Sequence, residues 1–543
     1  MESNILYGSG SKGYGQAGAS TTKRALKALN AVLSGSPRED IDENNYTLRQ
    51  RGRMLVMSSP IATSAVKTNR TNTIGLGLKL NPRPDKEILG LTPEQVKEWQ
   101  KVVKAEFNLW ASKKRNCDST SMNDFYEMQQ LCFYSWLSSG DVFILRKEKD
   151  VLNCPYSLKL HVIEADRCST PENSFGLGFG SHLTEGKNSA NGNRIYDGVE
   201  VDADGAVVAY WFRNTYPYQC TWEETDWTRV EAYGSTTGLP NVIHLMNSER
   251  PEQYRGVTYL APVVEQILQL RRYTESEIMA AVVESFFTAF IKTEADTDVS
   301  GMPFNEIGDG QPGSDEASYD PNEYELGPGV MNVMNPGEDV VFAEPKRPAS
   351  GFENFFKAVC KQCGAALEIP ADLLMKEFNA SYSASRAALM EAWKAFKMYR
   401  QWFTSGFCKP IYEIWLSEAI ARGRINAPGF FNDPLVHEAW LGSEWIGPSQ
   451  GQLDPVKEVN AEILAVQNGF TTHEAATARL NGSDWDSNVD QLMLEHQKFK
   501  GINSVSTPES TPDDINKDDN PDDDEDDDKN NKEGGKEDEP TNE

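Results

Sequence analysis

The chain has 543 residues, of which 39% are hydrophobic, and this length suits about two to four packed domains. Its formal net charge of −29 excludes a protein that wraps nucleic acid over its whole surface, because that mode needs many Lys and Arg at phosphates. The charge is uneven, since residues 501–543 contain 17 acidic and 4 basic residues, which leaves about −16 for the first 500 residues.

Eight cysteines are spread without the spacing of a disulfide scaffold, which favours a reducing compartment. The start, MESNILYGSGSKGYG, has no apolar segment typical of a secretory signal. The best apolar run, residues 278–291, is too short to span a bilayer and contains Glu284. We therefore expect a soluble intracellular protein with no membrane partner.

The N-terminal half is predicted to pass from helices to strands. Residues 1–48 are rich in Gly, Ser and charge and resemble a mobile arm with a short helix at 23–33. Helices are expected over 51–67, over 92–114 with Thr92 as N-cap, and over 122–136 with an end near Gly140. The segments DVFILRKEK, SLKLHVIEA and RIYDGVEVDADGAVVAYWFRN then indicate strands, with Asp204-Gly205 predicting a type I′ hairpin turn. Residues 50–250 thus read as one α/β layer domain.

A long helix and a short return helix follow in the sequence. Residues 256–293 predict a nearly uninterrupted helix of up to about 55 Å. After a Gly, Pro and acid-rich insertion at 294–328, GVMNVM and DVVFAE predict a strand pair around residues 335–337. A second helix is expected at 351–367. Two helices that flank a small β excursion predict a stem with a projecting tip.

The segment SYSASRAALMEAWKAFKMYRQWF, residues 381–403, predicts a helix with two distinct faces. Ser383 and Ser385 are candidate N-caps. The core-facing stripe consists of Leu389, Ala392, Phe396, Tyr399, Phe403 and Phe407, and the adjacent basic face of Arg386, Lys394, Lys397 and Arg400. A basic face is either solvated or in contact with a polyanion. Further helices are expected at 453–467, 472–480 and 489–499, followed by an acidic tail that cannot fold alone.

Enzyme motifs give little support to a catalytic function. GPSQG at 447–451 matches a nucleophile elbow, and Asp484 and His496 follow in the order of a hydrolase triad. However, Pro448 precedes Ser449 and no helix pattern follows at once, so a plain loop is favoured. The glycine-rich segment at 8–18 follows no strand, and Gly-Lys-Ser/Thr does not occur, so no phosphate loop is expected.

Metal and cofactor motifs are equally weak. Cys360-x-x-Cys363 is a lone pair in a segment with apolar neighbours, which favours two buried residues over a zinc site. The six histidines show no ligand spacing. We therefore expect no enzyme, no catalytic residues, no metal and no cofactor.

Several stretches together resemble the portal proteins of lambda-like tailed bacteriophages. The segments that carry the resemblance, in order and spacing, are DGVEVDADGAVVAYWF, RPEQYRGVTYLAPVVEQILQLRRYTESEIMAAV, PKRPASGFENFFKAVCKQCGAALEIPADLLMKEFNASYSASRAALMEAWKAFKMYRQWF, GPSQGQLDPVKE and GSDWD. The resemblance covers about residues 51–500. Near the N-terminus the chain departs from it: Arg51, Arg53 and Leu55 match, but Met57 and Ser58 stand where the family usually has Arg-Asn.

The resemblance implies an α+β portal fold with a defined order of parts. That order is a flexible arm (1–50), an α/β wing (51–250), a wing-to-stem helix (251–293), a small β-containing clip (294–350), a stem helix (351–368), a tunnel loop (369–383), a long helix towards wing and crown (384–425), a crown-like helical region (426–500) and a disordered acidic tail (501–543). The role of the tail stays open between a solubilising brush and a docking site for a basic partner.

The resemblance also implies function and partners. Portals are ring-shaped homo-oligomers, usually dodecameric, at the unique capsid vertex of the virion, through which double-stranded DNA is packaged and later ejected. The expected partners are the terminase large subunit, the major capsid protein and scaffold, and a head-tail adaptor, with assembly in the host cytoplasm. The residues expected to face DNA are Lys376, Asn379, Ser381, Tyr382, Arg386, Lys394 and Lys397. The alternatives are a non-portal scaffold or adaptor of virion assembly and, remotely, a serine hydrolase that uses Ser449.

Overall fold

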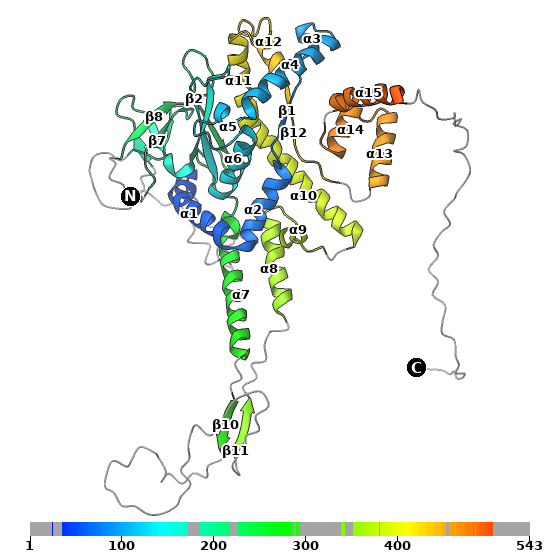
Figure 1. The fold of residues 1–543 in the computed structure, drawn as a ribbon. Coiled ribbons are helices and arrows are strands. Elements are labelled where there is room, and N and C mark those ends of the chain that lie inside the picture. The colour runs from blue at the N-terminus through cyan, green and yellow to red at the C-terminus, as the bar shows by residue number, and fades with distance from the viewer. Residues whose placement is uncertain are drawn as a thin grey trace, which may run out of the picture. The chain divides into compact units, whose positions relative to one another are not determined.

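The computed structural model describes residues 24, 26, 35–171, 185–217, 225–285, 289–293, 338–342, 351–378, 381–451, 455–483 and 485–502. The chain divides into two compact units, Met1–Gly482 and Ser483–Glu543. In the second unit the described helix is α15, Trp485–Ile502. The elements of the first unit are shown in Figure 1.

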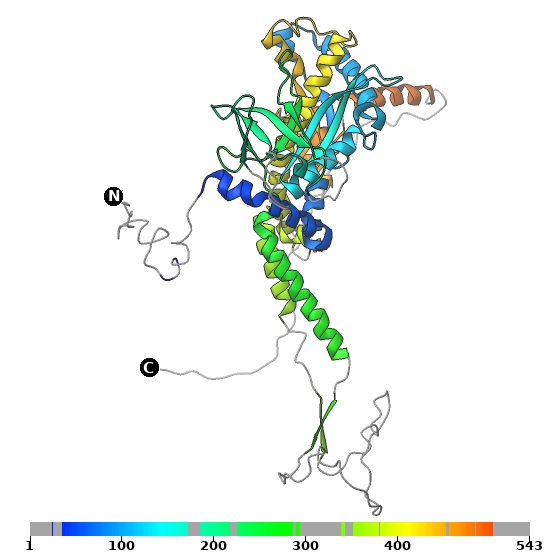
Figure 2. The ribbon, with the colours of Figure 1, turned by 90° about the vertical axis from the view of Figure 1, so that its left-hand side faces the viewer.

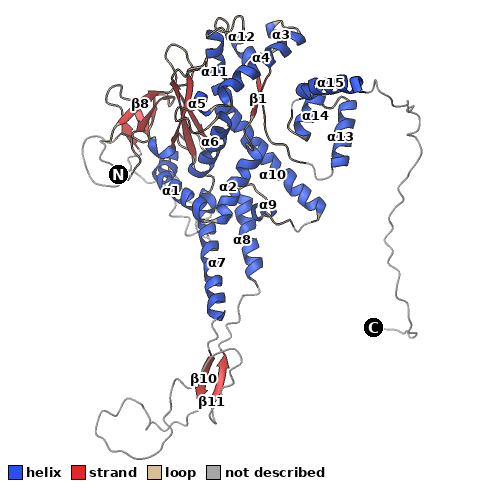
Figure 3. Cartoon of the chain, in the orientation of Figure 1, coloured by secondary structure: helices blue, strands red, loops and turns tan. Residues whose placement is uncertain are grey.

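The first unit mixes helices with small antiparallel sheets, as Figure 3 shows. Its helices are α1 Glu43–Ser58, α2 Pro60–Thr73, α3 Lys86–Leu89, α4 Pro93–Ala111, α5 Lys114–Cys117, α6 Phe125–Ser139, α7 Val264–Ser285, α8 Phe352–Ala366, α9 Ala371–Met375, α10 Tyr382–Phe403, α11 Lys409–Ala421, α12 Pro434–Leu441, α13 Pro455–Gln467 and α14 His473–Leu480. Its strands are β1 Lys79–Pro82, β2 Asp141–Glu148, β3 Leu158–Glu164, β4 Glu185–Lys187, β5 Arg194–Tyr196, β6 Val199–Val201, β7 Val207–Arg213, β8 Trp227–Glu231, β9 Val242–Met246, β10 Ala289–Thr293, β11 Glu338–Phe342 and β12 Ser443–Ile446.

The helix predicted at 51–67 is wrong in its bounds, because two helices meet there. α1 ends at Ser58 and α2 begins at Pro60, with the extended residue Ser59 between them. Proline has no N–H to donate and fits the first helical position, where that donor would be unpaired anyway. Ser59 caps α2 by accepting a hydrogen bond from the N–H of Ala62.

Local capping signals predicted the next helices well. Thr92 and Gln95 form a capping box at the start of α4, as the Thr92 prediction required. α6 has a similar box between Asp124 and Glu127 and ends at Gly140, whose φ of 93° suits glycine. The helix expected at 122–136 is therefore confirmed, shifted by about one turn.

The strands form two main antiparallel sheets, in the orders β3-β2-β9 and β4-β5-β6-β7-β8. β6 and β7 form the predicted hairpin, but its turn is not type I′, because Gly205 has positive φ and Asp204 does not. Instead the Asp202 carboxylate accepts hydrogen bonds from the N–H groups of Asp204 and Ala206. A separate pair, β1 with β12, joins residues more than 360 positions apart in the sequence.

The single long helix predicted at 256–293 is wrong. A short 3-10 turn at Ala261–Val263 leads into α7, which has 22 residues and is about 33 Å long. Residues 289–293 are strand β10, which pairs with β11. The strand expected at 329–334 lies outside the described residues, so its predicted pairing with β11 stays a prediction, beside the observed pairing of β11 with β10.

α8 returns beside α7, as Figures 1 and 2 show. Tyr273 on α7 contacts Phe352 and Phe355 on α8, with ring centroids 5.5 and 4.9 Å apart. The helix predicted at 351–367 is thus confirmed. The expected helices at 381–403, 453–467 and 472–480 are also confirmed as α10, α13 and α14, and the one at 489–499 lies within the longer α15.

One large hydrophobic core holds the first unit together. Its buried residues come from α1, α2, α4, α6, β2, α11 and β12, and extend from Leu55 to Trp445. A smaller core packs the five-stranded sheet against β2 and β9 through Phe143 and Phe212. Within the described part of the chain, none of the helices has both the length and the apolar character needed to cross a membrane.

Candidate nucleic-acid interface

The residues predicted to face DNA lie on α9, α10 and the segment between them. Pro370 precedes α9, which ends at Lys376, a residue with left-handed backbone (φ 57°). The Ser64 hydroxyl on α2 donates a hydrogen bond of 2.7 Å to the Leu374 carbonyl, so α9 is fixed to the body of the unit. Asn379 lies outside the described residues, and so does the side chain of Tyr382.

α10 begins differently from the prediction. Its N-cap is Ser381, which makes no capping hydrogen bond, and its hydroxyl lies 3.4 Å from that of Ser383. Ser383 and Ser385 lie inside the helix, so their assignment as N-caps is wrong. The apolar stripe is largely confirmed, because Ala392, Phe396, Phe403 and Phe407 are buried. Leu389 is an exception, since it lies beside a cavity.

The predicted basic face of α10 splits into two groups. Arg386, Lys397 and Arg400 line one cavity of about 690 Å³, whereas Lys394 lines another of about 530 Å³. Lys394 forms an ion pair of 2.6 Å with Glu391, one turn earlier on the same helix. Lys376 lies apart from both groups, beside a third cavity that Lys67 also lines.

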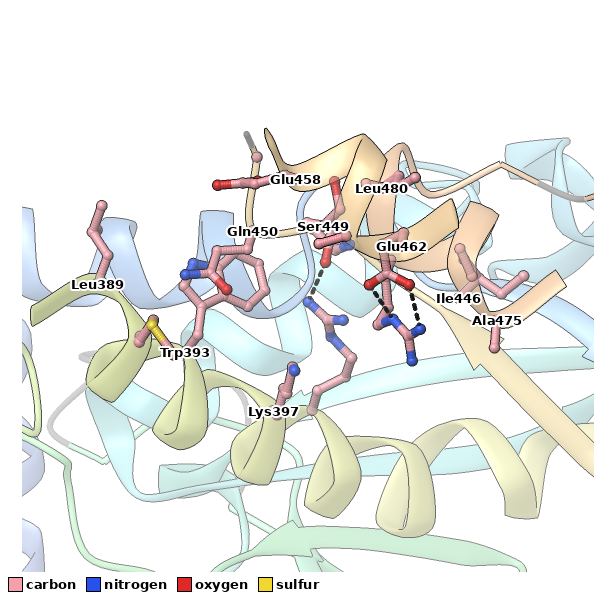
Figure 4. A pocket seen from close by; sticks show the side chains of 18 of the residues that line it. Leu389, Trp393, Lys397, Ile446, Ser449, Gln450, Glu458, Glu462, Ala475 and Leu480 are labelled. Carbon is pink, nitrogen blue, oxygen red and sulfur yellow. Dashed lines mark hydrogen bonds and ion pairs between the residues drawn. The ribbon is translucent and has the colours of Figure 1, made fainter. Parts of the chain in front are cut away.

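The larger cavity lies between α10, β12 with its following loop, α13 and α14. Figure 4 shows Leu389, Trp393 and Lys397 of α10 pointing toward Ser449, Gln450 and Glu458. Arg386 is 3.5 Å from the Glu458 carboxylate, and Arg479 binds Glu462 at 2.7 Å. Lys397 makes no ion pair with any described residue, so its charge is available to an anion.

Arg400 has a structural role instead of an anion-binding one. Its guanidinium donates hydrogen bonds of 2.9 Å to the carbonyls of Asn72, Thr73 and Pro448 and lies over the ring of Trp393. Burial lowers the Arg400 pKa to about 10. Because the last carbonyls of α2 carry the negative end of its dipole, Arg400 ties α10 to α2 and to the loop after β12.

The sequence analysis missed a buried ionic cluster near α1. Arg255 pairs with Asp141 at 2.6 Å and with Asp197 at 2.7 Å, and Arg49 pairs with Asp197 at 3.4 Å and with Asp166 at 3.0 Å. Arg53 and Asp42 lie at its edge. The cluster joins α1, β2 and the segment before α7, which come from distant parts of the sequence. Only the matched Arg53 and the RPEQYRG segment hinted at these positions.

Charge and burial set the pKa values in this cluster. Burial, followed by the negative charge of Asp197, raises the Asp42 pKa to about 7. Burial would also raise the Asp141 pKa, but Arg255 and a hydrogen bond with His244 hold it well below its usual range. The cluster therefore contains one carboxyl that readily keeps its proton, Asp42, and one that is firmly ionised, Asp141.

The described residues around Ser449 do not form the nucleophile elbow of a hydrolase. Ser449 is in the loop after β12, and Gln450 and Gly451 continue that loop, so the strand–turn–helix of a nucleophile elbow is not formed. Asp484 lies outside the described residues, and His496 is on α15 in the second unit.

The close cysteine pair is buried, as expected. Cys360 and Cys363 are 0% and 1% exposed on α8, and burial raises the Cys360 pKa to about 11. Among the described residues, no group of three or more His, Cys, Asp or Glu side chains is arranged to hold a metal ion.

Comparison with known proteins gives consistent matches in sequence. The family model "Phage portal protein, lambda family" matches residues 22–400. Portal protein B of Escherichia phage lambda is 23% identical over 479 residues, which are 84% of this chain and 86% of the relative. The portal protein of Escherichia phage N15 is 24% identical over 83% of this chain and 84% of its own length. The probable portal protein of Halomonas phage phiHAP-1 is 24% identical over 85% of this chain and 82% of its own length.

Solved structures also resemble the chain. The virion of a native gene transfer agent particle contains a chain with 13% identity and a TM-score of 0.41, over 81% of this chain and 94% of that one. A chain in the neck of the empty particle has 13% identity and a TM-score of 0.42, over 84% of this chain and 97% of that one.

Proposed function

Starting from the fact that the chain belongs to the lambda family of phage portal proteins, we propose that its copies form a ring at the unique capsid vertex, through which double-stranded DNA is packaged and ejected. The observation that carries this proposal is the family match over 22–400, together with relatives aligned over more than 80% of both chains. Portal proteins of this family are structural components of phage particles and not catalysts.

We assign the parts of the portal to the described elements as follows. The helices and sheets from α1 to β9 form the wing, α7 and α8 the stem, and the pair β10–β11 belongs to the clip. Residues 369–383, which include α9 and the first two residues of α10, form the tunnel loop, and the rest of α10 leads back into the body. Three features support this assignment: α7 and α8 lie side by side, the strand pair falls between them in sequence, and α9 follows α8 directly.

DNA would pass the end of α9 and run along α10 in this arrangement. Lys376 is exposed and makes no ion pair with any described residue, and the same holds for Lys397. Arg386 and Lys394 already face Glu458 and Glu391. We therefore rank Lys376 and Lys397 above Arg386 and Lys394 as phosphate contacts, while Asn379, Ser381 and Tyr382 remain candidates from the resemblance.

The acidic composition fits a conduit better than a clamp. Every Lys or Arg that binds a phosphate releases counterions and strengthens binding, so a lumen rich in such residues would hold the duplex in place. A few basic positions in a chain with a net charge of −29 would guide DNA and let it slide. Tight DNA binding by the isolated ring with a steep salt dependence would contradict this part of the proposal.

The ring would dock the terminase large subunit during packaging, the head-tail adaptor afterwards, and the major capsid protein and scaffold around it. These partners follow from the family. With these partners, the proposed location is the virion, with assembly in the host cytoplasm.

Negative-stain electron microscopy of the purified full-length protein tests the proposal, with mass measured on the same sample. We expect closed rings of about a dozen subunits with a central channel wide enough to pass a B-DNA duplex. A closed oligomer without a channel would contradict the portal function and favour a scaffold or adaptor.

A further inference from the structure

Across the larger cavity, the basic side of α10 faces carboxylates. Glu458 and Glu462 of α13 and Glu444 of β12 line the same cavity as Arg386 and Lys397. Figure 4 shows Lys397 and Glu458 on opposite walls. Arg386 lies 3.5 Å from the Glu458 carboxylate. A guanidinium binds carboxylate and phosphate oxygens with the same geometry, so Glu458 occupies donors that suit a DNA phosphate equally well.

The ion pair between Arg386 and Glu458 is weak. Its nitrogen and oxygen are 3.5 Å apart, longer than the roughly 2.7–2.9 Å of a charge-assisted hydrogen bond, and the two side chains are 41% and 22% exposed. Ion pairs in contact with water contribute little to stability and are screened by salt. By contrast, Glu462 binds Arg479 of α14 through two hydrogen bonds of 3.1 and 2.7 Å. Of these two carboxylates, Glu458 is therefore the one that a phosphate displaces more easily.

The helix that carries Glu458 has little apolar anchoring. No residue of α13 is buried, although the structure describes the whole helix, and in α14 the buried residue is Ala476. Polar contacts tie α14 to β1 and the residue after it: Glu474 accepts a hydrogen bond of 3.2 Å from the Asn81 side chain and pairs with Arg83. α13 can therefore shift locally and withdraw Glu458 without opening a hydrophobic core.

α10, in contrast, is fixed to the body of the unit. Its side chains Ala392, Trp393 and Phe396 are buried, and Arg400 binds the carbonyls at the end of α2. Because α10 is one continuous helix, its basic residues keep their backbone positions when α13 shifts. The basic side is therefore the constant part of this contact, and the carboxylate is the part that moves.

We propose that Glu458 is an autoinhibitory competitor of double-stranded DNA: it neutralises Arg386 when no duplex is present, and a phosphate must displace it to bind there. Each phosphate contact made in this way breaks an ion pair, so it adds less attraction than a contact to a cation without such a partner. The duplex is thus guided along α10 without being held. This inference rests on the proposed function, because it names what regulates the grip of the same interface on DNA.

Glu458→Gln tests the competitor, because it removes the charge of the carboxylate and keeps its size. Binding of a fluorescent duplex to the full-length protein is measured by anisotropy over a salt series. We expect tighter binding at low salt. We also expect the slope of log binding constant against log salt concentration to steepen by about 0.9 for each phosphate that Arg386 newly neutralises.

Glu462→Gln is the matched control, since it removes the same charge from the same helix and the same cavity. Arg479, the partner of Glu462, lies on α14 and keeps a hydrogen bond of 2.7 Å to the Thr471 hydroxyl. The slope should therefore change less for Glu462→Gln than for Glu458→Gln.

A double-mutant cycle separates the specific contact from the general effect of removing a negative charge. Arg386→Gln should abolish the gain in slope from Glu458→Gln, because the cation that this variant releases is then missing. Equal gains with and without Arg386, equal gains for Glu458→Gln and Glu462→Gln, or no DNA binding by Glu458→Gln at the lowest salt concentration would each overturn the inference. In these cases the portal function stands if rings with a channel form. Failure to form such rings would instead contradict the proposed function, whatever the slopes.

Hydrogen exchange in the unmodified protein gives a second readout that needs no variant. Addition of the duplex at low salt should speed the exchange of α13 amides, because Glu458 leaves Arg386 and the helix loses this contact. Exchange in α11, whose side chains lie in the large core, should stay unchanged. DNA binding with unchanged or slower exchange in α13 would overturn the inference.

Discussion

At the scale of single residues, the buried ionic cluster has an imbalance of charge. Asp42, Asp141, Asp166 and Asp197 face the guanidinium groups of Arg49, Arg53 and Arg255, so four carboxyls share three buried or half-buried cations. A buried charge without a partner is costly, and the group usually takes up a proton instead. Asp42, with its pKa raised to about 7, is the carboxyl that does so.

This imbalance predicts a specific pH dependence of stability. Because the Asp42 pKa is raised in the folded state from 3.8 to about 7, the folded chain retains a proton that the unfolded chain has lost. The unfolding free energy should therefore fall as pH rises from about 4 to about 7, and the full penalty remains above pH 7. Asp42→Asn cannot ionise, so its stability relative to the unmodified protein should increase across this window.

Chemical unfolding at pH 5 and pH 8 measures the effect. Asp40→Asn is the control, because Asp40 lies on the same helical turn but is exposed and pairs with Arg250. The reverse trend for Asp42→Asn, or an equal shift for Asp40→Asn, would contradict the assignment of the proton to Asp42.

Residue-scale geometry also separates two lysines three positions apart on α10. Lys397 lines the larger cavity without an ion pair to a described residue, whereas Lys394 is paired with Glu391. If Lys397 binds a phosphate, Lys397→Gln should reduce the slope of log binding constant against log salt concentration by about 0.9 for each phosphate that is no longer neutralised. Lys394→Gln should change the slope less. Fluorescence anisotropy with a duplex over a salt series measures both, and equal slopes for all three proteins would remove Lys397 from the interface.

At the scale of elements, the sequence predicted best what neighbouring residues determine. The capping box at Thr92, the end of α6 at Gly140 and the hairpin after β6 depend on residues within a few positions of each other. The pairing of β10 with β11 joins residues about 50 positions apart, and the hydrogen bond from Arg400 to the Thr73 carbonyl joins residues about 330 positions apart. Periodicity carries no information about such contacts, so α7 was predicted too long and Arg400 was read as part of a basic face.

The contrast between local signals and contacts of distant residues also predicts that alanine substitutions at two glycines with positive φ differ in their cost in unfolding free energy. A Cβ at Gly140 would lie 2.5 Å from the Gly256 carbonyl oxygen, where α6 meets the backbone before α7. At Gly90, which ends α3, a Cβ would have nothing within 4 Å. Gly90→Ala should cost only the strain of a left-handed residue, about 1 kcal/mol. Gly140→Ala should cost roughly 3 kcal/mol or more, because a backbone clash adds to the strain.

Denaturant unfolding of the two glycine variants measures this difference. Similar losses of unfolding free energy would mean that α6 and the segment around Gly256 can move apart at little cost. That result would contradict the close approach on which the neighbouring ionic cluster depends.

At the scale of the whole molecule, composition predicted the acidic character and the resemblance of several stretches predicted the family, but neither predicted how the parts meet. The core from Leu55 to Trp445 brings the C-terminal strand β12 back to β1. The larger cavity arises from this return, since β12 and its loop form one wall and α10 another. The pairing of β1 with β12 could not be predicted from a single sequence, because the paired residues are more than 360 positions apart.

The distribution of charge over the whole chain leads to a prediction about the acidic tail. Removal of residues 503–543 changes the formal net charge from −29 to −16, while every described element of the first unit is retained. If the tail acts as a solubilising brush, the shortened protein should form the same oligomer with the same number of subunits. It should nevertheless aggregate more readily at low ionic strength, since net charge keeps particles apart. Light scattering with mass measurement at 20 and 300 mM salt distinguishes the cases: loss of the oligomer would show that the tail takes part in assembly, because a brush contributes repulsion and no contacts.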